Sequence, residues 1–180
     1  MWEKEKVNDW YSDQKWLVGC NYLPSTAINQ LEMFQEDNFD FETNKREIGW
    51  ANDIGFNSLR IYLHDLLWQD KESFKKRLNK TLSLCLNFNI KPTLVLFDDC
   101  HRPFPKLGKQ PLPVRGVHNS GWKQSPGHKI VKEIAIGNKK EEARLKIFVQ
   151  EVLDDFRDDE RILLWDLYNE PGQFGIGDES

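Results

Sequence analysis

The chain has 180 residues, of which 39% are hydrophobic and 30% charged, a composition typical of a globular domain with a buried core. Its net charge is −4 and it has no long run of Lys or Arg. Because phosphate groups are bound by clustered cations, this argues against a nucleic-acid partner and against an anionic membrane surface. We therefore expect a ligand that is neutral or weakly charged.

The first residues are too charged to form the apolar core of a signal peptide, and no segment predicts a transmembrane helix. As written, the sequence predicts a cytoplasmic protein; a secreted or periplasmic one is expected only if a leader has been removed. Cys20, Cys85 and Cys100 have no Cys-x-x-Cys spacing. That pattern favours reduced thiols over a disulfide framework or a zinc site.

Four short apolar segments follow a stretch of about residues 1–15 that we interpret as a leader. They are rich in β-branched or aromatic residues and nearly continuously apolar, as strands covered on both faces are. The four predicted strands are residues 16–22, 57–63, 92–97 and 162–168.

Segments with helical periodicity separate these strands. The first begins at Asn44, which resembles a capping-box residue with Glu47, and ends at Gly55. The second follows Asp70 and repeats an apolar residue every four positions up to residue 86. The third covers about residues 140–157, with Ile147 among its predicted inward residues.

Two of the links that lead from a strand to a helix are long, residues 23–41 and residues 98–138. Long loops in a compact domain are usually functional, so they mark one end of the sheet as the functional end. The alternation of strands and helices predicts an α/β fold with a parallel sheet, of the TIM-barrel type. A complete barrel needs eight such units in about 250 residues. We therefore predict that residues 1–180 are the amino-terminal half of a barrel domain, with its first four strand units.

The residues Asn169-Glu170-Pro171 directly follow the last predicted strand. A carboxylate is thus expected at the carboxyl end of a strand, where α/β barrels place their chemistry. Strand alternation puts Arg60 and Asp166 on one face. In one interpretation Arg60 orients the site carboxylates and lowers their pKa values; in the other, a buried pair of Arg60 and Asp166 only fixes the barrel floor.

Two runs carry a resemblance to a known group of enzymes: Asn57-Ser58-Leu59-Arg60-Ile61-Tyr62, and Trp165-Asp166-Leu167-Tyr168-Asn169-Glu170-Pro171. Over about residues 15–172 the chain resembles the clan-A glycoside hydrolases, particularly cellulase-like family 5 enzymes and their family 2 relatives. The resemblance implies a TIM barrel in which Glu170 is the general acid/base. It also implies that Asn169 binds the sugar 2-hydroxyl and that Arg60 is the second-strand arginine of the clan.

Retaining hydrolysis requires a second carboxylate about 5 Å from the first, which attacks the anomeric carbon. In the clan this nucleophile is a Glu at the end of the seventh strand. Because this sequence predicts only the first four strands, we expect the chain to be inactive by itself. Asp65, Asp98 and Asp99 are predicted to reach the same face, as substrate or structural contacts. We expect no cofactor. We also expect no metal at residues 98–101, because neighbouring side chains on an extended chain point apart.

Aromatic side chains in the loops are candidates for stacking on a sugar ring. Trp122 is the first choice, because it is grouped with His118 and other polar residues. Trp68 and Phe104 are further candidates. We predict that Trp16, Trp50 and Trp165 belong to the core.

The preferred function is thus a fragment of a retaining glycoside hydrolase that acts on β-glycosidic bonds of oligo- or polysaccharides. A non-catalytic carbohydrate-binding or assembly subunit is the alternative. A different barrel enzyme, in which Asn-Glu-Pro is coincidental, is a third reading. Besides a carbohydrate, the expected partner is a second half barrel or another copy of the chain, because half a barrel exposes two strand edges.

Overall fold

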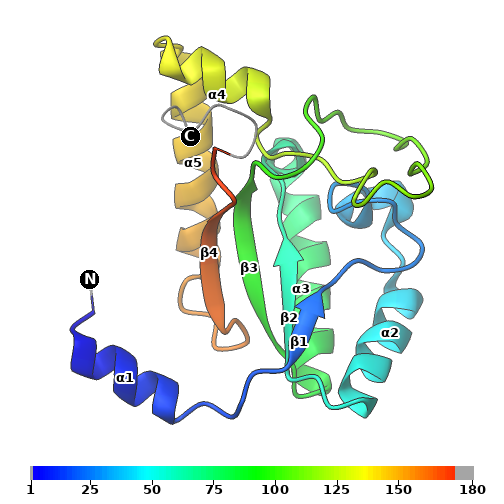
Figure 1. Cartoon of the computed structure of the whole chain (residues 1–180), viewed down its shortest axis with the longest axis vertical. Coiled ribbons are helices and arrows are strands. Elements are labelled where there is room, and N and C mark those ends of the chain that lie inside the picture. Colours follow the sequence, from blue (N-terminus) through cyan, green and yellow to red (C-terminus); the bar gives the residue numbers. More distant parts are fainter. Residues whose placement is uncertain (1, 173–180) are drawn as a thin grey trace.

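The computed structural model describes residues 2–172, which form an α/β fold around one parallel sheet (Figure 1). The strand order is β1-β2-β3-β4. Their bounds are Gly19–Asn21 for β1, Ser58–Tyr62 for β2, Lys91–Asp98 for β3 and Leu164–Asn169 for β4. The predictions of an α/β fold and of four parallel strands are confirmed.

Three helices connect consecutive strands: α2 (Phe41–Asp53), α3 (Lys71–Asn87) and α5 (Lys139–Phe156). They contribute to a single apolar cluster with Leu59 and Ile61 of β2 and Leu94 and Leu96 of β3, so all three cover the same face of the sheet. In a doubly wound sheet the strand order reverses and helices cover both faces. Sequential strands with helices on one face are instead consistent with part of an α/β barrel.

The predicted start of α2 is wrong. The helix begins earlier, at Phe41, and is capped by Asp40, whose carboxylate accepts a hydrogen bond from the Thr43 amide at 2.9 Å. Asn44 is buried in the first turns instead and accepts a hydrogen bond from the Tyr22 hydroxyl at 3.0 Å. The end is as predicted, since Gly55 follows the helix with a positive φ of 92°.

Several of the predicted core side chains are exposed, among them Leu86 at the end of α3, which is 52% exposed. Trp16 is 79% exposed because it precedes the short edge strand β1, and Trp50 is 57% exposed on the outer side of α2. Ile147 faces outward as well, and Phe148, Val152 and Phe156 form the buried side of α5. Trp165 does pack against the core.

Two helices lie in segments that the sequence did not predict as helical. The expected leader contains α1 (Lys4–Ser12), which buries none of its residues and lies apart from the sheet (Figure 1). The long segment of residues 98–138 contains α4 (His128–Ala135). In the described part of the chain, no helix combines the length and the apolar character needed to cross a membrane.

The two long loops are fastened to each other. The Asn29 amide donates to the Gln110 side chain at 3.0 Å and to the Gly121 carbonyl at 2.7 Å. Gln35 exchanges two hydrogen bonds with the Gly108 backbone, at 2.6 and 3.1 Å. Gly121 has no room for a side chain, since an added Cβ would lie 2.8 Å from Ile28. These contacts fix the loop after β3 at the carboxyl end of the sheet.

Candidate functional site

Arg60 joins the polar side chains at the carboxyl ends of β2 and β4. Its Nε donates to Asp166 Oδ2 at 3.1 Å, its Nη2 to Asn169 Oδ1 at 3.0 Å, and its Nη1 to the Tyr62 hydroxyl at 2.5 Å. The strand register explains the meeting, because Tyr62 and Asp166 both pair with Val95 of β3. The pair of Arg60 and Asp166 exists, but both side chains remain more than a quarter exposed. It is therefore accessible from solvent.

Asp98 holds Asn169 from the β3 side. Its carboxylate is 1% exposed and accepts hydrogen bonds from Asn169 Nδ2 at 2.7 Å, from the Cys100 amide at 3.3 Å and from His101 Nδ1. The Asn169 amide is thus fixed at both ends, its oxygen by Arg60 and its nitrogen by Asp98. One N–H of that amide remains for another acceptor.

Glu170 lies at the surface, with a backbone φ of 47°. This left-handed conformation is uncommon for a residue with a side chain and is found where the surroundings enforce it, often at functional sites. Burial, the neighbouring Glu170 carboxylate and the charges of Asp98 and Asp99 raise the pKa of the Cys100 thiol to about 12, so the thiol stays protonated.

Asp99 secures the turn after β4. Its Oδ2 accepts from the Gly172 amide at 2.8 Å, and its own amide donates to the Asn169 carbonyl at 3.0 Å. The two adjacent aspartates at the end of β3, Asp98 and Asp99, therefore both hold residues 169–172. This explains how Glu170 is kept in a strained backbone conformation.

An aromatic group borders these carboxylates. The Trp122 ring meets Tyr62 edge-on with centroids 5.0 Å apart, and lies 4.9 Å from the His101 ring. Burial, opposed by the charge of Arg60 and reinforced by those of Asp98 and Asp166, raises the pKa of Tyr62 to about 12. Trp122 remains half-buried, so part of its surface is available to a ligand.

A cavity of about 300 Å³ lies beside this group, lined by Cys100, His101, Arg102, His118 and Asn119. It contains His118, which is exposed and pairs with Asn119 at 3.1 Å. Five of the six predicted site residues form one connected group: Asn169 precedes Glu170 and hydrogen-bonds Arg60 and Asp98, and Trp122 joins them through Tyr62 and His101. His118 joins them through the cavity.

Other predictions about this end of the sheet are wrong. Trp68 does not lie beside the candidate site at the carboxyl end of the sheet. It packs edge-on against Phe74 and Phe148, and its Nε1 donates to Glu151 at 2.6 Å. The expectation that residues 98–101 remain extended is also wrong. The chain turns after Asp98, and this turn brings His101 back to the Asp98 carboxylate. The only sequence feature that indicates this contact is an Asp and a His three residues apart. Across residues 2–172, no group of three His, Cys, Asp or Glu side chains is placed to hold a metal ion.

Asp65 belongs to a separate, buried network. Its carboxylate accepts from Ser125 Oγ at 2.8 Å and from Arg144 Nη1 at 2.7 Å, and lies 3.2 Å from His64 Nδ1. Burial alone would raise the pKa of Asp65, but His64 and the Arg144 guanidinium outweigh it and lower the pKa to about 2. The prediction that Asp65 reaches the same face as Glu170 is therefore wrong, since Asp65 fastens β2 to the long loop and to α5.

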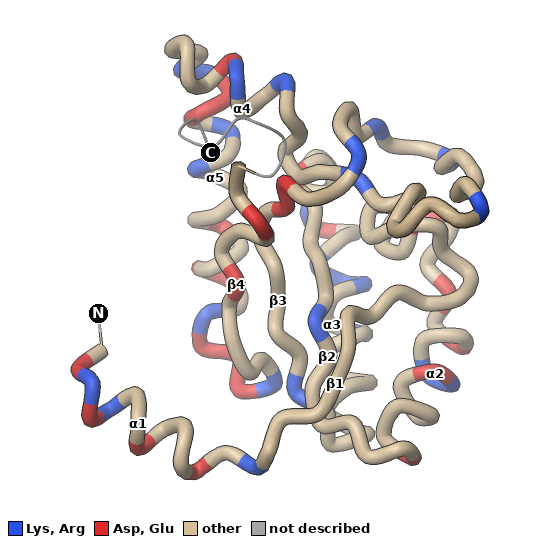
Figure 2. The backbone as a smooth tube through the Cα atoms, in the orientation of Figure 1, with Lys and Arg blue, Asp and Glu red and all other residues tan. Residues whose placement is uncertain are grey.

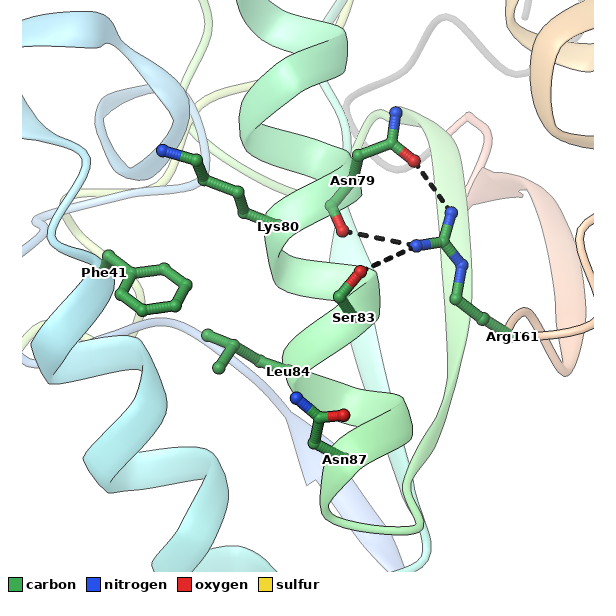
Figure 3. Close-up of a pocket in the computed structure, with 7 residues that line it drawn as sticks. All are labelled: Phe41, Asn79, Lys80, Ser83, Leu84, Asn87 and Arg161. Carbon is green, nitrogen blue, oxygen red and sulfur yellow. Dashed lines mark hydrogen bonds between the residues drawn. The ribbon is translucent and has the colours of Figure 1, made fainter.

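A larger cavity, of about 490 Å³, lies between α2, α3 and the turn before β4 (Figure 3). Arg161 lines this cavity, and its guanidinium already donates to Asn79, Ser83 and Asp159. Its other polar lining residues come from the exposed side of α3. None of the described residues that line the cavity is an Asp or Glu, and its arginine is already hydrogen-bonded. It is therefore a weaker candidate for an active site than the carboxyl end of the sheet.

Comparisons of the chain with family models, with curated proteins and with solved structures find no match.

Proposed function

We propose that the chain supplies the acid/base half of the active site of a retaining β-glycosidase, with Glu170 as the general acid/base. The observation that supports this is the placement of Asn169 and Glu170 at the end of β4, with Asn169 held between Arg60 and Asp98. The proposal rests on that geometry and on the resemblance of the two strand motifs to clan-A enzymes.

The geometry supports a distinct role for each residue. Glu170 is exposed, so its carboxyl group is accessible to the glycosidic oxygen of a ligand. The fixed amide of Asn169 has one N–H left for a sugar hydroxyl, and Trp122 offers a half-buried ring for stacking. Asp98 acts as a positioning residue, since its oxygens are already used by Asn169, Cys100 and His101.

Hydrolysis with retention also needs a nucleophile, about 5 Å from the acid. In the described part of the chain, the carboxylates nearest to Glu170 along the strand ends are engaged: Asp98 with Asn169, Asp99 with Gly172 and Asp166 with Arg60. We propose that the nucleophile comes from further strands of a complete barrel, and that the 180-residue chain has no turnover alone.

The test compares the 180-residue chain with the product of the complete open reading frame that encodes it, on aryl β-glycosides. We expect turnover only from the complete product. Glu170→Gln should lower kcat on poor leaving groups by about 10²- to 10⁴-fold, the usual worth of a general acid/base. Glu160→Gln, an exposed carboxylate in the turn before β4, is the matched control and should leave kcat unchanged.

Three outcomes would contradict parts of the proposal. Turnover by the 180-residue chain would refute the claim that it is half of a site. An unchanged rate for Glu170→Gln would remove its catalytic role. A complete product that hydrolyses no glycoside would refute the glycosidase assignment.

One observation favours a second function, a non-catalytic carbohydrate-binding subunit. The engaged carboxylates just described leave Glu170 as the most exposed acid of the cluster, without a second free carboxylate beside it. Such a subunit would bind a polysaccharide without cleaving it. Binding by a complete product that shows no turnover is the result that distinguishes the two.

A further inference from the structure

The loop after β3 carries an unusual distribution of charge. Residues 100–127 contain no Asp or Glu, although the whole chain has a net charge of −4. Figure 2 shows Lys and Arg, and no acidic residue, along this part of the loop. The cations are Arg102, Lys106, Lys109, Arg115 and Lys123.

None of these cations takes part in any of the ion pairs that the described residues form, whereas Arg60, Arg144 and Arg161 all do. Arg102 and Arg115 are exposed. An unpaired guanidinium keeps its full set of donors and binds carboxylates in a two-pronged geometry. The loop therefore presents positive charge that no carboxylate of the described chain neutralises.

The loop is also held in place by buried hydrogen bonds. A charged segment that only faced the solvent would not need such contacts. Buried amides of Asn29 and Gln110 fasten its middle, and Gln124 fastens its end by donating to the Asp99 carbonyl at 2.9 Å. Arg102 lines the cavity of about 300 Å³ together with His118 and Cys100. Because the Cys100 amide and the Asn169 side chain both donate to the Asp98 carboxylate, this cavity lies beside the turn that carries Glu170.

We infer that the cavity and the basic loop of residues 100–127 bind an acidic sugar, one that carries a carboxylate, next to the bond that Glu170 protonates. This inference rests on the proposed function, because it takes the site to be one for carbohydrate. It replaces the expectation of a neutral or weakly charged ligand, which came from the net charge and from the lack of a long run of Lys or Arg. A net charge averages over the surface, whereas a ligand at this end of the sheet meets the local excess of cations.

The test is affinity electrophoresis of the complete product in gels that contain polymannuronate, an acidic β-linked polysaccharide, or neutral β-linked hydroxyethyl cellulose, which measures binding whether or not hydrolysis occurs. We expect retardation by polymannuronate that weakens with added salt. Arg102→Gln and Arg115→Gln should each weaken this binding by about fivefold, near the upper worth of an exposed ion pair. Lys76→Gln, an exposed cation on α3, is the matched control and should have no effect.

The inference fails if polymannuronate does not retard the protein, if hydroxyethyl cellulose retards it equally, or if the two arginine variants behave like the control. It also fails if single-stranded DNA at equal charge concentration abolishes the retardation, because the loop would then bind any polyanion. Each of these results leaves the role of Glu170 in glycoside hydrolysis untouched, since that role is measured by turnover. Folding of each variant is checked by its thermal unfolding.

Discussion

Asp65 illustrates how a single buried charge contributes to the stability of this chain. The carboxyl is 1% exposed, and His64 and Arg144 lower its pKa from 3.8 to about 2. A carboxyl with a lowered pKa in the folded state stabilises that state above its ordinary pKa. The contribution, about 2 kcal/mol, is therefore complete above pH 4 and is lost as the pH falls from about 4 to about 2.

Removing the cation should expose this dependence. Arg144→Leu leaves Asp65 as a buried carboxylate without its guanidinium, and we expect the free energy of unfolding at pH 7 to fall by about 2 to 3 kcal/mol. The acid-induced unfolding midpoint should move to higher pH, because the pKa of Asp65 rises. Urea unfolding followed by circular dichroism across pH 2 to 7 measures both effects.

Arg157→Leu, at the end of the same helix, provides the comparison. Its ion pairs with Asp154 and Asp158 are exposed, so its loss should cost less than about 1 kcal/mol. Equal costs for the two variants, or an unchanged acid midpoint for Arg144→Leu, would contradict the assigned role of Asp65.

Sequence alone located Arg60 and Asp166 on one face, since strand alternation is a local rule. It did not locate His101, because its approach to Asp98 depends on a turn that no alternation rule describes. It also placed Asp65 near Glu170, since the partners that turn Asp65 away, Ser125 and Arg144, are 60 and 79 residues distant in the chain.

At the scale of elements, the contact between the two long loops determines the form of the site. Asn29 is buried and its amide is bonded to Gln110 and Gly121. An unmade buried hydrogen bond costs about 1 to 3 kcal/mol, so this contact governs how often the loop opens. The loop carries Arg102 and Trp122, and its position decides whether the cavity beside Glu170 exists.

Asn29→Ala should loosen this loop without unfolding the sheet. We expect trypsin cleavage after Lys106, Lys109 and Arg115 to accelerate about tenfold, because local opening becomes more frequent. Peptide mapping by mass spectrometry over time gives the rates. Gln150→Ala, at an exposed amide on α5, is the control. If the loop is cleaved no faster in Asn29→Ala than in this control, the hydrogen bonds of Asn29 do not hold the loop in place.

The strands could be located from their apolar composition, but three details of the helices could not. The start of α2 is set by the Asp40 carboxylate, while Asn44 is used by Tyr22 across the fold. The outward side of α5 includes Ile147 because Phe148, Val152 and Phe156 fit the core better. The short helix α4 lies in a segment rich in Gly and Pro, where composition favours a loop.

For the whole molecule, the described sheet is open. β1 and β4 each have one strand neighbour, and Leu167 on β4 is 66% exposed. Unpaired strand edges of this kind promote association with another chain. The identity of the partner could not be predicted from the sequence, because pairing depends on surfaces outside the described sheet.

We expect the 180-residue chain to associate at micromolar concentrations rather than to sediment as a 21.3 kDa monomer. Leu167→Lys should shift the distribution toward the monomer, since a charge at an edge opposes pairing. Leu112→Lys, at an exposed leucine of the loop, should not. Sedimentation velocity distinguishes these cases, and a wild-type chain that is monomeric throughout would contradict the expected pairing of edges.

The most direct test of the central claim, that Glu170 is the acid/base of a retaining glycosidase, is azide rescue of Glu170→Gln in the complete product. Without its acid, the variant should still form the glycosyl intermediate from a 2,4-dinitrophenyl β-glycoside, whose leaving group needs no proton. Azide should then restore turnover and yield a β-glycosyl azide. A variant with the wild-type rate, or with a loss of rate that azide does not restore, would contradict the account.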